Sequence, residues 1–161
     1  MERYQDLLQR AEAAFAAGEP RQSIELFADA EQLAIDAGHP DLADRAFCNR
    51  CAVLIELDEA TEEIPRLKRI LLSSGDLRNR WLAAYYTAMA YDLEDELDRA
   101  LSYAKRTREL AAALDERALD ARCANLTGTL AVRGSYFDEA ESAYRDALAA
   151  HVGLEGYHRI T

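Results

Sequence analysis

Apolar residues recur along this chain with the spacing of one helix face. The first stretch carries Tyr4, Leu7, Ala11 and Ala14, each three or four positions from the next, and this spacing predicts an amphipathic α-helix. Comparable stretches continue to about residue 150, and apolar runs with a period of two, which would indicate strands, are absent. The sequence therefore predicts eight helices, near 4–17, 20–37, 40–57, 61–74, 77–93, 96–114, 116–133 and 137–150.

Glycine and proline mark several of the predicted helix ends. Gly18 and Gly38 close the first two helices, and Pro20 and Pro40 follow them in the first turn of the next helix. A proline is tolerated there because its missing N–H has no partner in that turn. Gly134 is predicted to end the seventh helix in the same way.

Two further turns are predicted from polar residues. Thr61, followed by two glutamates, is expected to cap the fourth helix. The segment Ser73–Asp76 joins a glycine stop to an aspartate cap, and we interpret it as a turn between repeats rather than as a domain boundary.

One twelve-residue pattern recurs four times. Its copies begin at Ser23, Glu63, Ala100 and Ala140, so the period is about 40 residues and contains two helices. Such a period is typical of an α-solenoid, in which each helix pair buries its apolar face against a neighbouring pair. We expect an all-α fold and a single repeat domain over 1–161 with four antiparallel helix pairs, near 3–38, 40–74, 76–114 and 116–150, and a tail over 151–161.

The repeated segments resemble the tetratricopeptide repeat. The clearest copy is Arg133-Gly134-Ser135-Tyr136-Phe137-Asp138-Glu139-Ala140, continued by Tyr144, Ala147 and Leu148. It has the glycine turn, the aromatic, the acidic pair and the small residue of that family, followed by an aromatic and an alanine at helical spacing. Weaker copies cover 97–104 and 18–30, and the copy at 63–70 is the most degenerate. The period exceeds the family's usual length of about 34 residues, so longer helices are expected.

The resemblance implies a right-handed superhelix that binds a peptide or protein segment on a concave face lined by the first helix of each pair. Polar candidates for that face are Arg45, Asn49, Arg122 and Asn125, and candidates for an aromatic floor are Tyr85, Tyr86 and Met89. The alternative is that the polar residues are only solvated and the tyrosines pack between helices. The two-carboxylate clamp of some family members is not matched, because Leu8 and Glu12 stand where it needs Lys and Asn.

The fifth helix is the most aromatic part of the chain. Trp81 and Tyr85 lie four positions apart and therefore share a helix face. Aromatic residues are enriched in binding hot spots, but an interior helix of a solenoid is also expected to be aromatic. We favour packing in the core.

The cysteines and carboxylates do not indicate a redox or metal site. Cys48 and Cys51 lie in mid-helix and Cys123 lies two repeats away, whereas a redox cysteine favours a helix N-terminus and zinc takes four ligands. We expect all three to be small buried residues. The acidic run Asp92–Asp98 lacks the glycine and spacing of a calcium loop and is expected to be a solvated turn. No catalytic motif is found, so neither catalysis nor a cofactor is expected.

The chain is strongly acidic, with 30 acidic against 19 basic residues and a formal net charge of −11. Nucleic acid and anionic membranes would be repelled, so neither is expected as a partner. A basic or neutral protein segment fits better, although the charge can also serve solubility alone. Three cysteines without a disulfide framework, and no segment resembling a secretory signal or membrane span, favour the cytoplasm.

The C-terminal end of the predicted array leaves apolar residues to be covered. Val152, Leu154, Tyr157 and Ile160 lie in a short tail interrupted by two glycines. Either the tail folds back over the last helix pair, or that pair stacks on a second copy or on further repeats. We favour stacking, which implies a homodimer or a longer array.

Two other functions compete with the scaffold function. One is a self-associating assembly module, and the other is a sensory repeat domain of a larger signalling protein.

Overall fold

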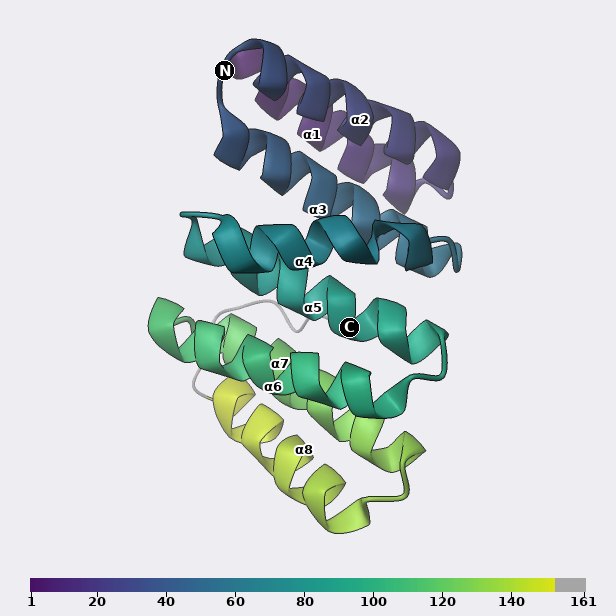
Figure 1. Ribbon diagram of the computed structural model, residues 1–161, viewed down its shortest axis with the longest axis vertical. Helices are drawn as coiled ribbons and strands as arrows, with labels where there is room; N and C mark the ends of the chain where they lie inside the picture. The colour runs from purple at the N-terminus through teal and green to yellow at the C-terminus, as the bar shows by residue number, and fades with distance from the viewer. Residues whose placement is uncertain (153–161) are drawn as a thin grey trace. The chain divides into compact units, whose positions relative to one another are not determined.

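The computed structural model describes residues 1–152, and all regular structure within that range is helical (Figure 1). This part of the chain forms eight α-helices and one 3-10 helix, η1, and contains no strand, which confirms the predicted all-α class. None of these helices combines the length and apolarity that crossing a membrane requires. The bounds are α1 Glu2–Ala16, α2 Pro20–Asp36, α3 Pro40–Glu56, η1 Thr61–Glu63, α4 Ile64–Ser73, α5 Leu77–Leu93, α6 Leu97–Leu114, α7 Arg117–Arg133 and α8 Phe137–Val152.

The chain forms two compact units, Met1–Tyr86 and Thr87–Thr161. The boundary lies inside α5 and not at the Ser73–Asp76 segment. That segment is a turn between α4 and α5, as predicted, and the Asp76 Oδ1 accepts a hydrogen bond from the Asn79 N–H at 2.9 Å. Asp76 therefore caps α5 in the manner expected of an aspartate at this position.

Gly18 and Gly38 end α1 and α2 in the left-handed conformation, with φ of 80° and 75°. In both turns the next residue donates its N–H to a carbonyl five positions back, from Glu19 to Ala14 and from His39 to Ala34, each at 2.9 Å. This is the bond pattern of a Schellman motif, which favours glycine because a Cβ is strained at positive φ.

Four further residues at helix ends have positive φ without being glycine: Asp58, Asp95, Asp115 and Ser135. Gly134 itself has φ of −83° and is the C-cap of α7, so the left-handed residue of that turn is its neighbour Ser135. Aspartate tolerates this conformation because its short polar side chain bonds locally. These turns recur at equal intervals, at positions 18, 38 and 58 in the first unit and at positions 95, 115 and 135 in the second.

The predicted cap of the fourth helix is wrong. Thr61 is the first residue of η1, and α4 begins three residues later at Ile64 with Pro65 in its first turn. The two glutamates after Thr61 complete the 3-10 turn instead of the first turn of the α-helix. A proline at the second position of α4 needs no N–H partner there, so the helix begins readily at this point.

The core of the first unit lies where α2 packs against α1 and α3 (Figure 1). Small residues such as Ala11, Ser23 and Ala30 are completely buried between the helices, which allows their backbones to approach closely. The Ser23 hydroxyl donates to the Ala11 carbonyl at 2.8 Å, so the one polar atom that Ser23 brings into this contact is satisfied. At the edge of this core, the Tyr4 hydroxyl donates to the Leu42 carbonyl at 2.7 Å.

Glu31 is buried among positively charged side chains. Its carboxylate in α2 forms ion pairs with Arg50 of α3, at 3.3 Å, and with Arg66 of α4. The Arg66 guanidinium also lies 3.8 Å from the centroid of the Phe47 ring, in a cation–π contact. One buried carboxylate thus joins three helices of the first unit.

In the second unit α7 packs against both α6 and α8. The contact faces are again made of small buried residues, among them Ala100, Ala104, Ala140, Ala143 and Ala147. The acidic run between α5 and α6 forms a turn, as predicted. Arg133 at the end of α7 bridges this turn by pairing with Asp92 and with Asp95, the latter at 2.9 Å.

Polar contacts in both units join residues 38 positions apart. In the first unit they connect Tyr4 to Leu42, Arg21 to Glu59 and Asp41 to Asn79. In the second they connect Asp95 to Arg133 and Arg108 to Asp146. The same separation in sequence therefore recurs among the polar contacts of both units, two positions short of the 40-residue spacing between alternate left-handed turns.

Candidate binding site

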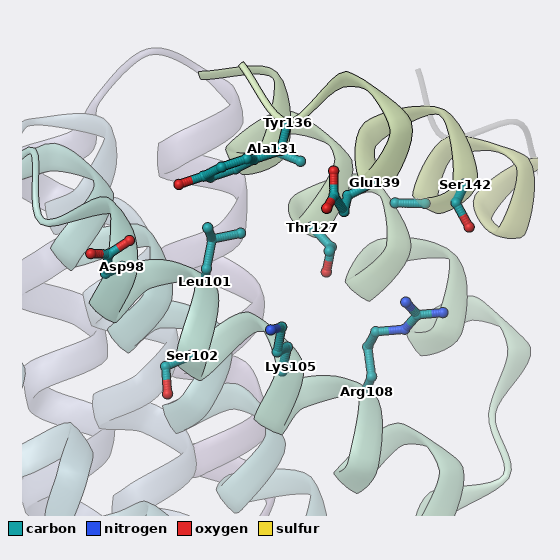
Figure 2. A pocket seen from close by; sticks show the side chains of 11 residues that line it. Asp98, Leu101, Ser102, Lys105, Arg108, Thr127, Ala131, Tyr136, Glu139 and Ser142 are labelled. Atoms are coloured by element: carbon teal, nitrogen blue, oxygen red, sulfur yellow. The ribbon is translucent and has the colours of Figure 1, made fainter. Parts of the chain in front are cut away.

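A pocket of about 590 Å³ opens between α6 and α8, over α7 (Figure 2). We refer to it as the α6–α8 pocket. It lies wholly within the second unit, and its volume falls in the range of ligand-binding pockets. The residues that line it are Asp98, Leu101, Ser102, Lys105, Arg108, Thr127, Ala131, Tyr136, Glu139, Ser142 and Ala143.

The pocket walls follow from helical spacing. On α6 the lining residues Asp98, Leu101, Ser102 and Lys105 have the spacing i, i+3, i+4 and i+7, which places them on one face. On α8, Glu139, Ser142 and Ala143 repeat the first three of these positions. The two helices thus present matching faces to each other, and most of the lining side chains on these faces are short.

Opposite charges occupy different parts of the pocket. Asp98 and Glu139 lie in the first turns of α6 and α8, where the helix dipole stabilises a carboxylate. Lys105 and Arg108 lie further along α6, and Figure 2 shows their side chains on the opposite side of the hollow from Glu139. The Arg108 guanidinium donates to Asp146 of α8 at 2.8 Å, and this ion pair connects the two walls.

Gly134 determines where the Tyr136 ring lies at the pocket rim. A Cβ on Gly134 would lie 2.6 Å from the Tyr136 Cε2 and 2.8 Å from the Leu97 Cδ2. Both distances are shorter than the contacts that non-bonded carbon atoms make. The absence of a side chain therefore leaves room for the ring. Figure 2 shows the Tyr136 ring extending over the hollow from the turn before α8. The glycine that the sequence marked as a helix end has this additional packing role.

Of the residues predicted to bind a peptide, Arg45 is engaged within the protein. Its guanidinium bonds to the Asn79 side chain and to Asp76 at 3.1 Å, and so connects α3 to the start of α5. Asn79 is fully buried and also donates to the Asp41 carbonyl at 2.8 Å. Arg45 therefore holds two elements of the first unit together. Asn49, one turn further along α3, is half-buried.

The tyrosines of α5 pack on each other and on Trp81. The Trp81 and Tyr85 rings stack with centroids 4.9 Å apart, and Tyr85 meets Tyr86 edge-on at 5.5 Å. Trp81 is completely buried and Tyr86 is 8% exposed, whereas Tyr85 and Met89 are half-buried. Tyr85 thus offers more surface to a ligand than Tyr86 does.

Arg122 and Asn125 are exposed on α7. They lie on a different face of that helix from Thr127 and Ala131, which line the α6–α8 pocket. Arg122 and Thr127 are separated by about 1.4 turns of the helix, and Asn125 and Thr127 by about half a turn. The structure therefore does not bring these two predicted residues into the pocket.

All three cysteines are buried as free thiols, as predicted. Burial raises the pKa of Cys48 to about 12, and the nearby Asp44 carboxylate adds to the effect. Burial also raises the pKa of the Cys51 thiol. Such thiols are poor nucleophiles at neutral pH. Within the described residues, no three His, Cys, Asp or Glu side chains gather in a way that could hold a metal ion.

Sequence reasoning missed the α6–α8 pocket. A signal was present, because the spacing of Asp98, Leu101 and Ser102 recurs at Glu139, Ser142 and Ala143. The recurring spacing indicates a pocket only if α6 and α8 face each other across α7, and the sequence pattern does not predict that arrangement.

No protein-family model matches the chain, and no curated protein is similar to it at a significant level.

Proposed function

We propose that this protein is a non-catalytic interaction module of the tetratricopeptide-repeat type, built of four stacked helix pairs, that binds a peptide or protein segment. The observation that carries the proposal is the α6–α8 pocket. It is an open hollow between the walls of two helices, lined by hydroxyl, charged and apolar side chains from three helices. Mixed linings of this kind suit a chain of amino acids, which presents all three chemistries.

The repeat part of the proposal is supported by two regularities. Left-handed turns recur at equal intervals within each unit, and polar contacts recur at a separation of 38 positions. In a stacked array each repeat contacts its neighbours through the same positions, so contacts at one fixed separation are expected. Buried small residues at Ser23, Ala60, Ala100 and Ala140 have a similar period.

Selection from a random peptide library tests the function. We expect peptides to be enriched over a control helical protein, with affinities in the micromolar range that is usual for an open groove. If repeated selection enriches nothing above the control, the proposed function is wrong.

The same peptides locate the binding surface. Binding on the concave face of the proposed array should be weakened by the double variant Tyr85→Ala with Arg122→Ala. Binding in the α6–α8 pocket should be unaffected by that variant and weakened by Leu101→Ser. Circular dichroism of each variant serves as the control for folding.

A second candidate function is self-association through α8. Phe137 and Leu148 are 66% and 65% exposed, and Tyr144, between them in sequence, is 41% exposed. The three lie on one helix face, with the spacing i, i+7 and i+11. The apolar tail residues beyond Val152, which the sequence analysis assigned to the same end, lie outside the described residues.

Sedimentation velocity tests self-association. If copies associate through α8, the double variant Phe137→Ser with Leu148→Ser should shift the protein to monomer. Leu72→Ser is the matched control, because Leu72 is 81% exposed but lies on α4 of the first unit. A wild-type protein that stays monomeric at high concentration would remove this candidate.

A further inference from the structure

We infer that the α6–α8 pocket binds an extended peptide segment in which a basic residue and a carboxylate lie about three residues apart. The inference rests on the proposed function and specifies its ligand. Lys105 and Arg108 supply two cations further along α6, and Asp98 and Glu139 supply two carboxylates near the helix N-termini. A ligand with one charge of each sign can therefore pair with both ends of the pocket at once.

The spacing of the ligand charges follows from helix geometry. Asp98 and Lys105 are seven positions apart on α6, about 10 Å at a rise of about 1.5 Å per residue. An extended peptide covers about 3.3–3.6 Å per residue, so about three residues span the same distance. The side chains between the two ligand charges would lie over Leu101, Ala131 and Ala143, which form the apolar part of the lining.

The charges of the pocket are open to a ligand. Within the described residues the structure records no ion pair for Lys105, Asp98 or Glu139, and all three are exposed. Arg108 uses one nitrogen to pair with Asp146. A guanidinium carries five N–H donors, so Arg108 keeps donors for a second carboxylate.

The charge of the whole protein selects against ligands that are only anionic. With a net charge of −11 the chain repels a polyanion, although Lys105 and Arg108 would attract a single carboxylate locally. A basic residue in the same ligand removes this cost and pairs with Asp98 and Glu139. The pocket therefore favours a segment with both charges over an acidic segment of equal length.

Calorimetric titration of short capped peptides tests this inference. In the parent peptide Arg and Glu lie three positions apart and are flanked by Thr and Val. In one control peptide Gln replaces Arg, and in the other Gln replaces Glu. We expect the parent to bind about five-fold more tightly than each Gln peptide at low salt, since partly exposed ion pairs have modest strength. The preference should shrink as salt rises.

Two protein variants determine the orientation of the ligand. In Lys105→Gln the preference for Glu over Gln in the peptide should shrink, because only Arg108 remains to pair with it, while the preference for Arg over Gln is unchanged. In Glu139→Gln the opposite result is expected. Lys68→Gln is the matched control, because Lys68 is the other of the two lysines in the chain and lies in the first unit.

The lysines also provide a direct readout. After isotopic dimethylation, the NMR signal of Lys105 should shift when the parent peptide is added, and that of Lys68 should not. The inference is overturned if library-selected peptides bind but neither pocket variant changes their affinity, in which case the proposed function stands. If no peptide of any kind binds, both fail.

Discussion

The ring of Tyr144 on α8 occupies the space where a side chain at Gly128 of α7 would lie. A Cβ at position 128 would be 2.7 Å from the Tyr144 Cε1 and 2.9 Å from its Cζ. Glycine in the middle of a helix costs about 1 kcal/mol relative to alanine. Here that cost is offset by the close packing of the ring against the α7 backbone.

We predict that Gly128→Ala and Tyr144→Ala are coupled. In the wild-type background an alanine at 128 displaces the ring, so the gain in helix propensity is cancelled or exceeded by lost packing. In a Tyr144→Ala background the same change should stabilise the protein by about 1 kcal/mol. Urea denaturation of the four proteins measures this coupling.

Leu148→Ala, one turn further along α8, provides the control background. The prediction is contradicted if Gly128→Ala has the same effect on stability with Tyr144 as without it.

The second prediction concerns the buried carboxylate of Glu31. Glu31→Gln keeps the shape of the side chain but leaves Arg50 and Arg66 without their negative partner. Removing one partner of a buried charge network typically costs about 3–5 kcal/mol, and we expect a loss near the lower end because both arginines are partly exposed. Thermal and urea denaturation measure the loss.

Glu59→Gln is the matched control for Glu31→Gln. Glu59 pairs with Arg21 on the surface, and the hydrogen bond from Arg21 holds the pKa of the Glu59 carboxyl below its usual value. Stability from such a lowered pKa is present above the unfolded value of about 4.3 and is lost as pH falls further. We therefore expect a small effect of this variant near neutral pH and none in acid. An equal loss from both variants would show that burial of Glu31 is unimportant.

The turns show which parts of the fold the sequence could predict. Helix positions follow from apolar periodicity, because each helix buries one face, and the eight predicted helices lie close to the observed ones. The positions of glycine in the sequence correctly indicated a left-handed residue only at Gly18 and Gly38. At Asp58 and Ser135 the same backbone conformation is adopted by residues that also occur in ordinary turns, so composition alone did not identify them.

The candidate site was less predictable than the fold. Helical spacing places Arg45 on α3 correctly, but only the structure shows that Asn79 and Asp76, more than 30 positions away, engage its guanidinium. The α6–α8 pocket likewise depends on which faces of α6 and α8 meet. Such pairings join residues distant in sequence, and periodicity within one helix contains no information about them.

The third prediction concerns the left-handed turns at Gly18 and Ser135, where substitutions are expected to change stability with opposite sign. Ser135 has φ of 61°, so Ser135→Gly should relieve strain and stabilise the protein by up to about 1 kcal/mol. Gly18 has φ of 80° and open space around its Cα, so Gly18→Ala should destabilise it by about 1 kcal/mol through backbone strain alone. Gly75→Ala is the control, because Gly75 also has open space but lacks positive φ. Equal responses at 18 and 75 would contradict this account.

The last prediction concerns the thiols. Cys48, Cys51 and Cys123 are completely buried, so a thiol-specific reagent at pH 8 should label none of them in the native protein and all three after denaturation. Rapid labelling of the folded protein would contradict the burial. The elevated pKa values of Cys48 and Cys51 add a dependence of stability on pH.

The sign of that dependence follows from proton binding. In the unfolded chain a thiol releases its proton near pH 9, whereas in the native protein Cys48 keeps it up to a pKa of about 12. The native state therefore binds more protons above pH 9, and its stability falls as pH rises from there. Replacing both Cys48 and Cys51 by Ala should flatten the decline between about pH 8.5 and 9.5, below the range in which Tyr4, whose pKa is raised by burial, begins to contribute. Urea midpoints measured across this range decide the matter, because an unchanged slope in the double variant would assign the alkaline loss to other groups.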